Sequence, residues 1–542
     1  MKTFSYEIVI EAADGLHVIS GETQLDSTRL VIEVSLPDCK IVSAKVYAPW
    51  GIKQNEKVFI NGYQTWTHCP EYSIDSKIRG LHRVPKFLIN AFSLDRYADY
   101  HFVNYPYQEG FVHGESYAYF RDNDFYRLVA SNDEFYGYTL ISYESYYNWG
   151  IGFSEDGLDD NRFGRLTLEK DCAGLSVNAG TYKLFDMYIG EGSEDEVFDG
   201  WFAQMECKCL TDKKIKGYSS WYNRYENISE KSIMEDLDGC SKVLDSMPEA
   251  PYGDLFQVDD GWESNVGDWL DVDIKKFPNG MKAIADKIHE KGFKAGLWLA
   301  PFSANKASKI YNEHPDWLLK VDDKPWMAGC NWGGFVSLDI DNPEVVDYIR
   351  KVFNTVFDEW GFDLVKLDFL YSAAPYGTAC NGYKITSSET YPIKETRAAR
   401  MCRAMDLLRE VCGKHMILGC GVPVWPAFGK VEYCRVSCDV SLNQKGPLYM
   451  RPAHREIVST AHAIETARLR QPLNGRAHLN DPDVFFLRDN NIHLSEEQKK
   501  TLATSCAKVH GVFLTSDNMG SYNEDKKSYY KELTDIFYSS DK

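Results

Sequence analysis

The chain of 542 residues has no long apolar segment, no cluster of basic residues and no low-complexity tract. A helix that crosses a membrane needs about 18 or more consecutive apolar residues, and no such run occurs. The amino-terminal segment reaches Tyr6, Glu7 and Glu11 before any apolar stretch that could be the core of a secretory signal. We therefore expect a soluble, cytoplasmic protein with no membrane partner.

Positive charge is scarce relative to negative charge. The chain carries 60 Lys and Arg against 80 Asp and Glu, for a formal net charge of -20, and its isoelectric point is near 5.2. Nucleic acids and anionic membranes bind through clustered Lys and Arg residues, whose contacts release counterions. The charge balance therefore argues against nucleic acid as a partner and favours a small or neutral ligand.

A disulfide framework and a metal site are also not indicated. The 14 cysteines are scattered, and several lie inside apolar segments, as reduced core thiols do. Cys207 and Cys209 are too close together for a zinc site, and no His or Cys follows them at ligand spacing. We expect no metal and no cofactor.

Residues 1–205 are expected to form an antiparallel β-sandwich. Hydrophobic residues make up 44% of the chain, enough for a large core in two or three domains. Segments such as 29–36 (RLVIEVSL) and 41–50 (IVSAKVYAPW) alternate apolar and polar residues, which is typical of strands with one buried face. Many short strands with regular turns favour a sandwich.

Residues 206–517 are expected to form a (β/α)8 TIM barrel, followed by a C-terminal helix or tail over 518–542. Short apolar runs alternate there with helical stretches, the pattern of βα units around a parallel sheet. Gly361 and Gly413 stand where helix C-caps are expected. The eight candidate strands are 217–222, 254–259, 293–299, 363–368, 415–420, 433–438, 478–484 and 510–515.

The fourth candidate strand carries the first chemical signal, within the segment FDLVKLDFLY. Side chains alternate faces along a strand, so Lys366 and Asp368 point the same way. At the mouth of a barrel, Lys366 would keep Asp368 ionised, as a carboxylate nucleophile requires. The alternative is a buried structural ion pair at a strand end.

The other strand ends supply more polar residues, and active sites of TIM barrels lie at that end of the sheet. Each has a structural alternative: an acid can cap a turn, Trp298 can be core, and Arg435 can simply pair with Asp439. The segment NGYQTW, which ends at Trp66, can reach a neighbouring site or pack beneath its own sandwich. The candidates are Asp259, Asp260, Trp298, Cys420, Arg435, Asp439 and Asn480 to Asp483.

Three chemistries use converging carboxylates. Asp259, Asp368 and Asp439 could hold a metal, but Lys366 and Arg435 would compete for the same negative charge. A phosphate-binding barrel would need a Gly-rich loop late in the chain, where only SDNMGS occurs. Glycoside hydrolysis needs two carboxyl groups and aromatic faces for the sugar ring, and this chain has both.

Several motifs in one order resemble the α-galactosidases of glycoside hydrolase family 36. The resemblance covers most of residues 55–515, and the combination of motifs in this order is highly specific. The motifs are NGYQTW, FQVDDGWE, GDW, KKFPNGM, KAGLWLAPF, HPDW, LVKLDF, GCGVP and RVSCD.

The resemblance implies a retaining exo-α-galactosidase that acts on small oligosaccharides without a cofactor. Asp368 matches the family's nucleophile and Asp439 its general acid/base, and Asp259 and Asp260 match the acids that bind the O4 and O6 hydroxyls of galactose. We expect Lys366 to lower the pKa of Asp368 and a less solvated setting to keep Asp439 protonated. Further sugar-subsite positions are matched by Trp298, Lys366, Cys420, Arg435 and Trp66.

The chain also departs from the family's usual form, and alternatives stay open. Only about 25 residues follow the eighth strand, where many members carry another β-sandwich, and the third strand continues as APF where many have an acid. The same site could serve an α-N-acetylgalactosaminidase or a raffinose-type galactosyltransferase. A non-catalytic sugar-binding protein and a metal-dependent barrel enzyme are further alternatives. The aromatic segment 116–126 is compatible with a homo-oligomer or with a sandwich core.

Overall fold

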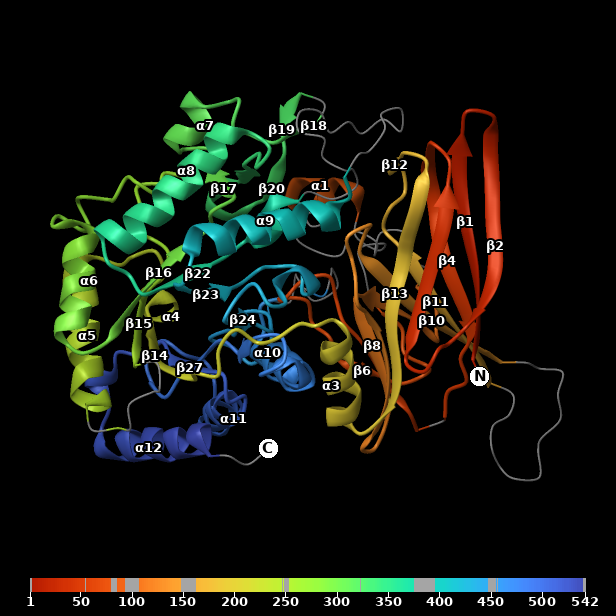
Figure 1. Ribbon diagram of the computed structural model, residues 1–542. Coiled ribbons are helices and arrows are strands. Elements are labelled where there is room, and N and C mark those ends of the chain that lie inside the picture. Colours follow the sequence, from red (N-terminus) through yellow and green to blue (C-terminus); the bar gives the residue numbers. More distant parts are fainter. Residues whose placement is uncertain are drawn as a thin grey trace.

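Antiparallel sheets from the first part of the chain lie beside parallel strands and helices from the rest (Figure 1). The computed structural model describes residues 2–53, 55–78, 85–92, 107–147, 162–245, 247, 253–321, 323–374, 395–446, 455 and 457–539.

The amino-terminal region contains two antiparallel sheets. One has the order β2-β1-β4-β11-β10-β7 with β12 added to β4, and the other has the order β3-β13-β9-β8-β5-β6. The first sheet comprises β1 (Thr3–Ala12), β2 (Gly15–Gln24), β4 (Cys39–Pro49), β7 (Phe111–Glu115), β10 (Thr139–Tyr147), β11 (Arg162–Lys170) and β12 (Ser176–Val177). The second comprises β3 (Arg29–Leu36), β5 (Lys57–Ile60), β6 (Glu71–Tyr72), β8 (Tyr117–Asp122), β9 (Phe125–Ser131) and β13 (Gly180–Gly192).

A hydrophobic core is shared by these two sheets. In β3 the alternate residues Leu30, Ile32, Val34 and Leu36 are buried, as period-two patterning predicts. The same cluster contains residues of both sheets, including Ile8 and Val46 from the first and Phe120 and Phe185 from the second. The antiparallel strands expected in residues 1–205 are therefore confirmed. Two helices also belong to this region, α1 (Lys86–Phe92) and α3 (Glu194–Gln204).

The rest of the chain builds a curled sheet in which each pair of neighbouring strands is parallel, in the order β25-β24-β23-β22-β16-β15-β14-β27-β26. Its two end strands, β25 and β26, are separated by only Pro482 and Asp483, so the sheet curls back on itself. Each of the eight predicted strand segments overlaps an observed strand, although the first observed strand begins at Ile215 and ends at Ser219, not 217–222. The strands are β14 (Ile215–Ser219), β15 (Leu255–Val258), β16 (Lys294–Leu299), β22 (Leu364–Leu367), β23 (Met416–Gly419), β24 (Tyr433–Arg435), β25 (Leu479–Asp481), β26 (Val484–Phe485) and β27 (Val512–Thr515).

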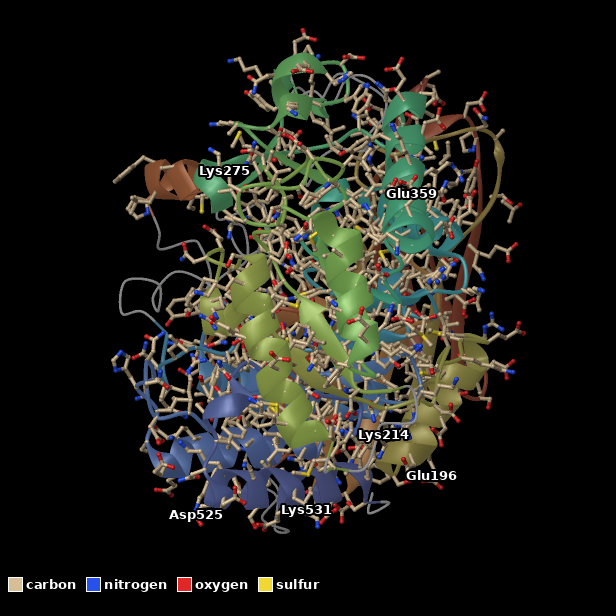
Figure 2. All side chains as sticks on the ribbon, turned by 90° about the vertical axis from the view of Figure 1, so that its left-hand side faces the viewer. Glu196, Lys214, Lys275, Glu359, Asp525 and Lys531 are labelled. Carbon is tan, nitrogen blue, oxygen red and sulfur yellow. The ribbon has the colours of Figure 1, made fainter. Side chains whose placement is uncertain are left out.

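Helices cover the outside of the curled sheet (Figures 1 and 2). In α8 the buried residues Val345, Ile349, Val352 and Phe353 form one helical stripe. The sequence predicts this helix as far as Gly361, but α8 ends at Asn354 and a wider π-turn follows over Thr355–Glu359. The helices are α4 (Trp221–Arg224), α5 (Glu230–Leu244), α6 (Gly280–Glu290), α7 (Lys309–Glu313), α8 (Pro343–Asn354), α9 (Arg397–Cys412), α10 (Thr460–Leu469), α11 (Glu496–Ala507) and α12 (Glu524–Tyr538).

A small antiparallel sheet follows β16 and lies near the carboxyl ends of the parallel strands. It has the order β17-β21-β20, formed by β17 (Ser303–Asn305), β20 (Met327–Gly329) and β21 (Phe335–Ser337), and β18 (Lys320–Val321) pairs with β19 (Lys324–Pro325) beside it. The single turn between β20 and β21 carries Trp332. An insertion after the third parallel strand therefore adds side chains to the end of the sheet where the site is expected.

The C-terminal helix α12 is docked against the sheet. Tyr530, Leu533 and Phe537 are buried, and the ring of Phe537 lies 5.3 Å from that of Phe513 in β27. The opposite face of the helix carries Asp525 and Lys531, which point outward in Figure 2. The segment predicted as a helix or a tail therefore contains a packed helix.

Replacing Phe537 with alanine should lower the free energy of unfolding by about 3–5 kcal/mol, because it leaves a cavity beneath α12. Urea denaturation followed by circular dichroism measures the change. Lys531→Ala on the exposed face is the control and should stay within about 0.5 kcal/mol of the wild type. Equal stability of Phe537→Ala and the control would contradict the docking of α12.

Candidate active site

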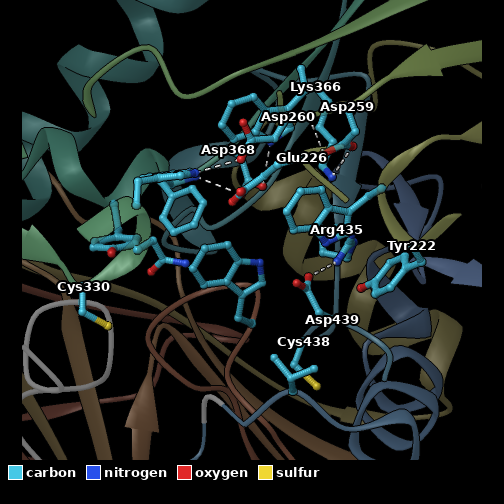
Figure 3. Close-up of a pocket in the computed structure, with 18 residues that line it drawn as sticks. Tyr222, Glu226, Asp259, Asp260, Cys330, Lys366, Asp368, Arg435, Cys438 and Asp439 are labelled. Atoms are coloured by element: carbon cyan, nitrogen blue, oxygen red, sulfur yellow. Dashed lines mark hydrogen bonds and ion pairs between the residues drawn. The ribbon is translucent and has the colours of Figure 1, made fainter. Parts of the chain in front are cut away.

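A cavity of about 370 Å³ lies at the carboxyl ends of the parallel strands. Figure 3 shows Asp259, Asp260, Lys366 and Asp368 gathered in one part of it, with Arg435, Asp439 and Tyr222 in another. Asn480 to Asp483, which were also candidates, are not among the lining residues. Of the nine side chains that the family resemblance assigns to the site, eight line this cavity, although they come from widely separated parts of the chain. They are Trp66, Asp259, Asp260, Trp298, Lys366, Asp368, Arg435 and Asp439.

Asp368 directly follows β22, and both of its oxygens are held. The indole Nε1 of Trp298 donates to Oδ2 at 3.1 Å, and the backbone N–H of Phe369 donates to Oδ1 at 2.9 Å. Trp298 is on β16 in register with Lys366 of β22, which brings its indole to the end of the neighbouring strand. The carboxylate is therefore fixed in one orientation, although Asp368 stands outside any regular element.

Lys366 pairs with Asp259, whereas the sequence predicts a pair with Asp368. Its Nζ lies 3.0 Å from Asp259 Oδ2, which also accepts a hydrogen bond of 2.8 Å from the Gln257 amide. Burial lowers the pKa of Lys366, but Asp259 and Asp368 raise it by more, so the ammonium stays charged. This cation thus serves two carboxylates that arrive on different strands.

The prediction that Lys366 lowers the pKa of Asp368 below its ordinary value is wrong. Burial raises the pKa of Asp368 and the negative charge of Asp439 adds to the rise, while Lys366 only opposes it. The net direction is upward because the carboxyl is buried and Lys366, which opposes the rise, is already paired with Asp259. The sequence shows the cation and the acid but not how deeply both are buried.

Asp260 is held by two groups that the sequence analysis did not identify, Glu263 and Trp332. The indole of Trp332 donates to Asp260 Oδ2 at 2.8 Å. Burial raises the pKa of Asp260 to about 6, against the opposing effect of hydrogen bonds from Glu263 and Trp332. Burial, with the charge of Asp260, raises the pKa of Glu263 well above its usual range. This rise favours the protonated form of Glu263, which can donate to Asp260.

Arg435 and Asp439 form the other part of the cavity. Arg435 Nη1 lies 2.8 Å from Asp439 Oδ1, as an ion pair between residues four apart. The side chain of Asp439 is 37% exposed, so the expected less solvated setting is wrong. The backbone carbonyl of Asp439 accepts a hydrogen bond from the N–H of Ser459, which caps α10. Asp439 is thus anchored by its main chain and open to water at its carboxyl group.

The loop that ends at Trp66 crosses from the antiparallel sheets to the cavity. Of the two readings left open, a loop that reaches a neighbouring site is the observed one. The indole of Trp66 donates to the thiol of Cys420 at 3.2 Å, and its ring meets those of Phe369 and Tyr371 edge to face. Cys420 itself is buried and is not among the residues that line the cavity.

A buried arginine at the end of α10 holds this loop. The guanidinium of Arg470 donates to the carbonyls of Gln64 and Thr65, at 3.1 and 2.6 Å, and to the side-chain oxygen of Asn61 at 3.0 Å. It also donates to the carbonyl of Val436, next to Arg435. One side chain thereby fixes the Trp66 loop to the strand that carries Arg435.

Aromatic rings supply much of the remaining wall. The ring of Trp332 contacts the rings of Trp298 and Phe369, with distances of 6.0 and 4.8 Å between the ring centres. Trp332 has φ 53°, a left-handed conformation that the two following glycines, Gly333 and Gly334, accommodate with positive φ of their own. The NWGG segment was a signal for this turn, because adjacent glycines mark a left-handed backbone.

Other lining residues were not selected from the sequence. Trp221, Tyr222 and Cys438 fall inside segments predicted as strands, 217–222 and 433–438, and most of the rest lie on turns with no periodic pattern. The full set is Trp221, Tyr222, Glu226, Cys330, Asn331, Tyr371, Cys438 and Val458, besides Trp332 and Phe369.

Within the part of the chain that the structure describes, no group of three or more His, Cys, Asp or Glu side chains is arranged to hold a metal ion. Among the same residues, no helix has the length and the apolar character needed to span a membrane. What the cavity offers is carboxylates of contrasting exposure, two fixed cations and aromatic faces. Such a set suits a neutral, hydroxyl-rich ligand.

Comparisons with known proteins agree with this geometry. Residues 242–383 match the family model named Melibiase, a segment that contains Asp259, Asp260, Trp298, Lys366 and Asp368. The chain is 32% identical over 157 residues to α-galactosidase Mel36A of Lactobacillus acidophilus, and 30% identical over 202 residues to an α-galactosidase of Escherichia coli. These matches cover 28% and 35% of this chain but only 20% and 25% of the two relatives.

Two solved structures share the fold over nearly the whole chain. TtGalA, an α-galactosidase from Thermus thermophilus solved with stachyose, superposes with a TM-score of 0.71 at 24% identity and covers 98% of this chain and 99% of its own. The family 36 α-galactosidase AgaA of Geobacillus stearothermophilus gives a TM-score of 0.58 at 14% identity, covering 98% of this chain and 69% of AgaA.

The fold and the site are thus those of a chain similar to glycoside hydrolases. Within that class, the resemblance to the α-galactosidases of family 36, first seen in the order of the sequence motifs, is confirmed.

Replacing Asp260 with asparagine should stabilise the protein at pH 8. The carboxyl has a pKa of about 6 in the folded chain and about 3.9 when unfolded, so its ionisation destabilises the fold increasingly between about pH 4 and pH 6, and by the full amount above pH 6. Asparagine keeps the acceptor for Trp332 without the charge. We expect the free energy of unfolding to rise by about 1–3 kcal/mol at pH 8.

This gain should vanish below about pH 4, where the carboxyl is protonated in both states. Urea denaturation at the two pH values measures it, with the exposed Asp525→Asn as the control that should change little. A loss of stability at pH 8 would show that Asp260 is not held as the structure places it.

Proposed function

We propose that this chain is a retaining exo-α-galactosidase, which hydrolyses terminal α-linked galactose from small oligosaccharides and needs no metal. The observation that carries the proposal is that Asp368 and Asp439 line one small cavity in contrasting surroundings. The first is buried and fixed by two donors, and the second is open to solvent beside a cation. Double displacement uses two such carboxyl groups in different roles.

Asp368 is the proposed nucleophile. Trp298 and the backbone of Phe369 orient its carboxylate, so little reorganisation is needed for attack on the anomeric carbon. The attack forms a covalent galactosyl-aspartate and releases the leaving oxygen. Because burial raises the pKa of Asp368, activity should fall on the acid side as this carboxylate takes up a proton.

Asp439 is the proposed general acid/base. It donates a proton to the leaving oxygen in the first step and takes one from water in the second, which returns it to its starting state. Its exposure supports this role, because the attacking water and the leaving sugar both need access from solvent. In a retaining enzyme the two carboxyl groups are expected to lie about 5–5.5 Å apart.

Asp259 and Asp260 are the proposed acceptors for the O4 and O6 hydroxyls of galactose. Galactose differs from glucose in the axial O4, so an epimer would leave buried carboxylate oxygens without donors. Lys366 is bound to Asp259 and is placed to donate to a hydroxyl as well. Trp298 and Trp66 offer apolar faces to the sugar ring.

The size of the cavity supports an exo-acting enzyme for short substrates. About 370 Å³ is near the lower end of ligand pockets, which suits one sugar residue held deeply with the remainder outside. TtGalA has been solved with stachyose, and AgaA variants with stachyose and raffinose. We propose small α-galactosides of this kind as the substrates here.

The architecture proposed with this function is a β-sandwich over residues 1–205, a (β/α)8 barrel over 206–517 and a helical C-terminal segment over 518–542. Two antiparallel sheets around one core support the sandwich. Counting β25 and β26 as one interrupted strand gives the curled sheet eight strands, which supports the barrel.

Asp368→Ala should reduce turnover of an aryl α-galactoside by at least about 10³-fold, because no nucleophile remains. Azide should restore part of the rate by taking the vacated place, and NMR should show β-galactosyl azide, whereas the wild type releases α-galactose. Asp259→Ala is the control and should not be rescued by azide. Removal of this binding residue leaves the nucleophile in place, so azide finds no vacant position beside the anomeric carbon. Near-wild-type turnover by Asp368→Ala would remove it from the role.

A second candidate is the same chemistry on N-acetylgalactosamine. A relative from Flavonifractor plautii named as an A type blood α-D-galactosamine galactosaminidase is 28% identical over 203 residues, covering 33% of this chain and 18% of that protein. Transfer of galactose to a sugar acceptor, as in raffinose-type galactosyltransferases, would use the same intermediate.

A panel of aryl α-glycosides of galactose, N-acetylgalactosamine, galactosamine and glucose separates these activities. We expect kcat/KM for the galactoside to exceed that for the glucoside by about 10³-fold or more, since the glucoside leaves buried acceptors unpaired. Preference for an amino or acetamido sugar would favour the second candidate. Oligosaccharide products at high galactoside concentration would indicate transfer.

A further inference from the structure

The guanidinium of Arg435 is shared by three carboxylates. Its Nη1 lies 2.8 Å from Asp439, its Nη2 lies 2.8 Å from Asp483, and its Nε lies 3.3 Å from Asp481. Arg435 is 3% exposed, and both Asp481 and Asp483 are 2% exposed. One buried positive charge therefore faces three negative groups, of which only Asp439 opens to solvent.

Asp483 is held firmly in this arrangement. Its Oδ2 accepts hydrogen bonds from the hydroxyl of Tyr222 at 2.7 Å and from the backbone N–H of Val440 at 2.8 Å. Its own N–H donates to Asp481 Oδ1 at 2.9 Å, and its φ of 77° lies in the left-handed region. A strained, buried acid with four partners is a fixed part of the site, and nothing in the proposed mechanism uses it.

The pair of Arg435 with Asp439 poses a difficulty for the proposed mechanism. A general acid must hold a proton when the substrate arrives, and a guanidinium at 2.8 Å favours the ionised form instead. Asp481 and Asp483 have the opposite effect on Asp439. They already pair with the guanidinium, and their negative charges repel a third carboxylate, which favours the protonated form of Asp439.

We infer that Asp483, acting through Arg435, is a positioning residue that divides the charge of the guanidinium and so lets Asp439 hold its catalytic proton. The inference rests on the proposed acid/base role of Asp439. Asp481 adds to the same effect through its longer contact with Nε. The NDPD motif, Asn480 to Asp483, is a candidate from the sequence that the proposed mechanism does not use. Its two acids thereby act on the proton of Asp439 through Arg435.

Other titratable groups also face Asp439, and they bear on its proton. Asp368 and Cys420, which directly follow β22 and β23, interact with it, and Cys438 is its chain neighbour. Tyr222 and Tyr225 interact with it from the α4 segment. Arg435 also interacts with Cys420, but among the described residues its ion pairs are with the three carboxylates. Burial raises the pKa of Asp483 to about 6, although Arg435 opposes the rise, so Asp483 is charged at pH 7 and above.

The test is Asp483→Asn, which removes the charge while keeping the size and an acceptor for Arg435. Asparagine also tolerates the left-handed backbone at this position. The readout is the pH profile of kcat/KM for an α-galactoside with a sugar leaving group, whose departure needs a proton. We expect the basic limb of the profile to move about one pH unit lower, and kcat/KM above that limb to fall about tenfold.

An activated aryl galactoside supplies the matched measurement, because its leaving group departs without a proton. Its kcat/KM in Asp483→Asn should lack the extra loss at high pH. Asp489→Asn, which removes an exposed acid six residues further along, is the control variant and should leave both profiles unchanged. Asp481→Asn should move the basic limb in the same direction by less, and it decides the question if Asp483→Asn does not fold.

A uniform drop of kcat/KM at every pH, with the basic limb unmoved, would overturn the inference and leave Asp483 a structural role. An unchanged profile would overturn it equally. Asp439→Ala distinguishes this failure from that of the proposed function. If Asp439→Ala keeps its rate on the sugar leaving group, the acid/base assignment itself fails. If it loses that rate while Asp483→Asn keeps the wild-type profile, only the inference about Asp483 fails.

Discussion

The site depends on a shortage of positive charge where buried carboxylates converge. Two cations, Lys366 and Arg435, serve the acids that come from the ends of several strands, and each cation is shared. Because each cation is shared, burial outweighs the attraction of Lys366 at Asp368, and the pKa of that carboxyl is raised. The pKa of Asp260 is raised as well, and this carboxyl lies beside Glu263, whose own raised pKa favours the protonated form. Burying several acids together costs free energy unless each is paired or hydrogen-bonded. A ligand with many hydroxyl groups can lower this cost by donating hydrogen bonds to the carboxylates.

The contact between the two parts of the chain follows from the same need to satisfy buried polar groups. Arg470 binds main-chain oxygens of the Trp66 loop on one side and of the strand carrying Arg435 on the other. The indole of Trp66 then closes the cavity against Phe369 and Cys420. The antiparallel sheets are therefore part of the site, since they supply a wall that the curled sheet lacks.

Much of the site could be predicted from the sequence because its residues stand at the ends of apolar runs. Asp259, Trp298, Lys366 and Arg435 were placed correctly at the cavity by counting strands and assuming that their carboxyl ends meet. Trp332 and Glu226 were not, because they lie on turns whose direction no local pattern determines. The family resemblance predicts Cys420 at the sugar subsite, yet Cys420 is not among the lining residues, and its thiol accepts a hydrogen bond from the indole of Trp66.

The sequence by itself determined the alternation of strands and helices, the eight parallel segments and the set of acids at their ends. Local periodicity and chain order are sufficient for these, since they follow from which face of each element must be buried. Only the tertiary structure decided which acid each cation serves. Lys366 turned to Asp259 on another strand, and Arg435 took up Asp481 and Asp483 as well as Asp439. Pairing and desolvation depend on distances between residues up to about a hundred positions apart, and a one-dimensional pattern does not contain them.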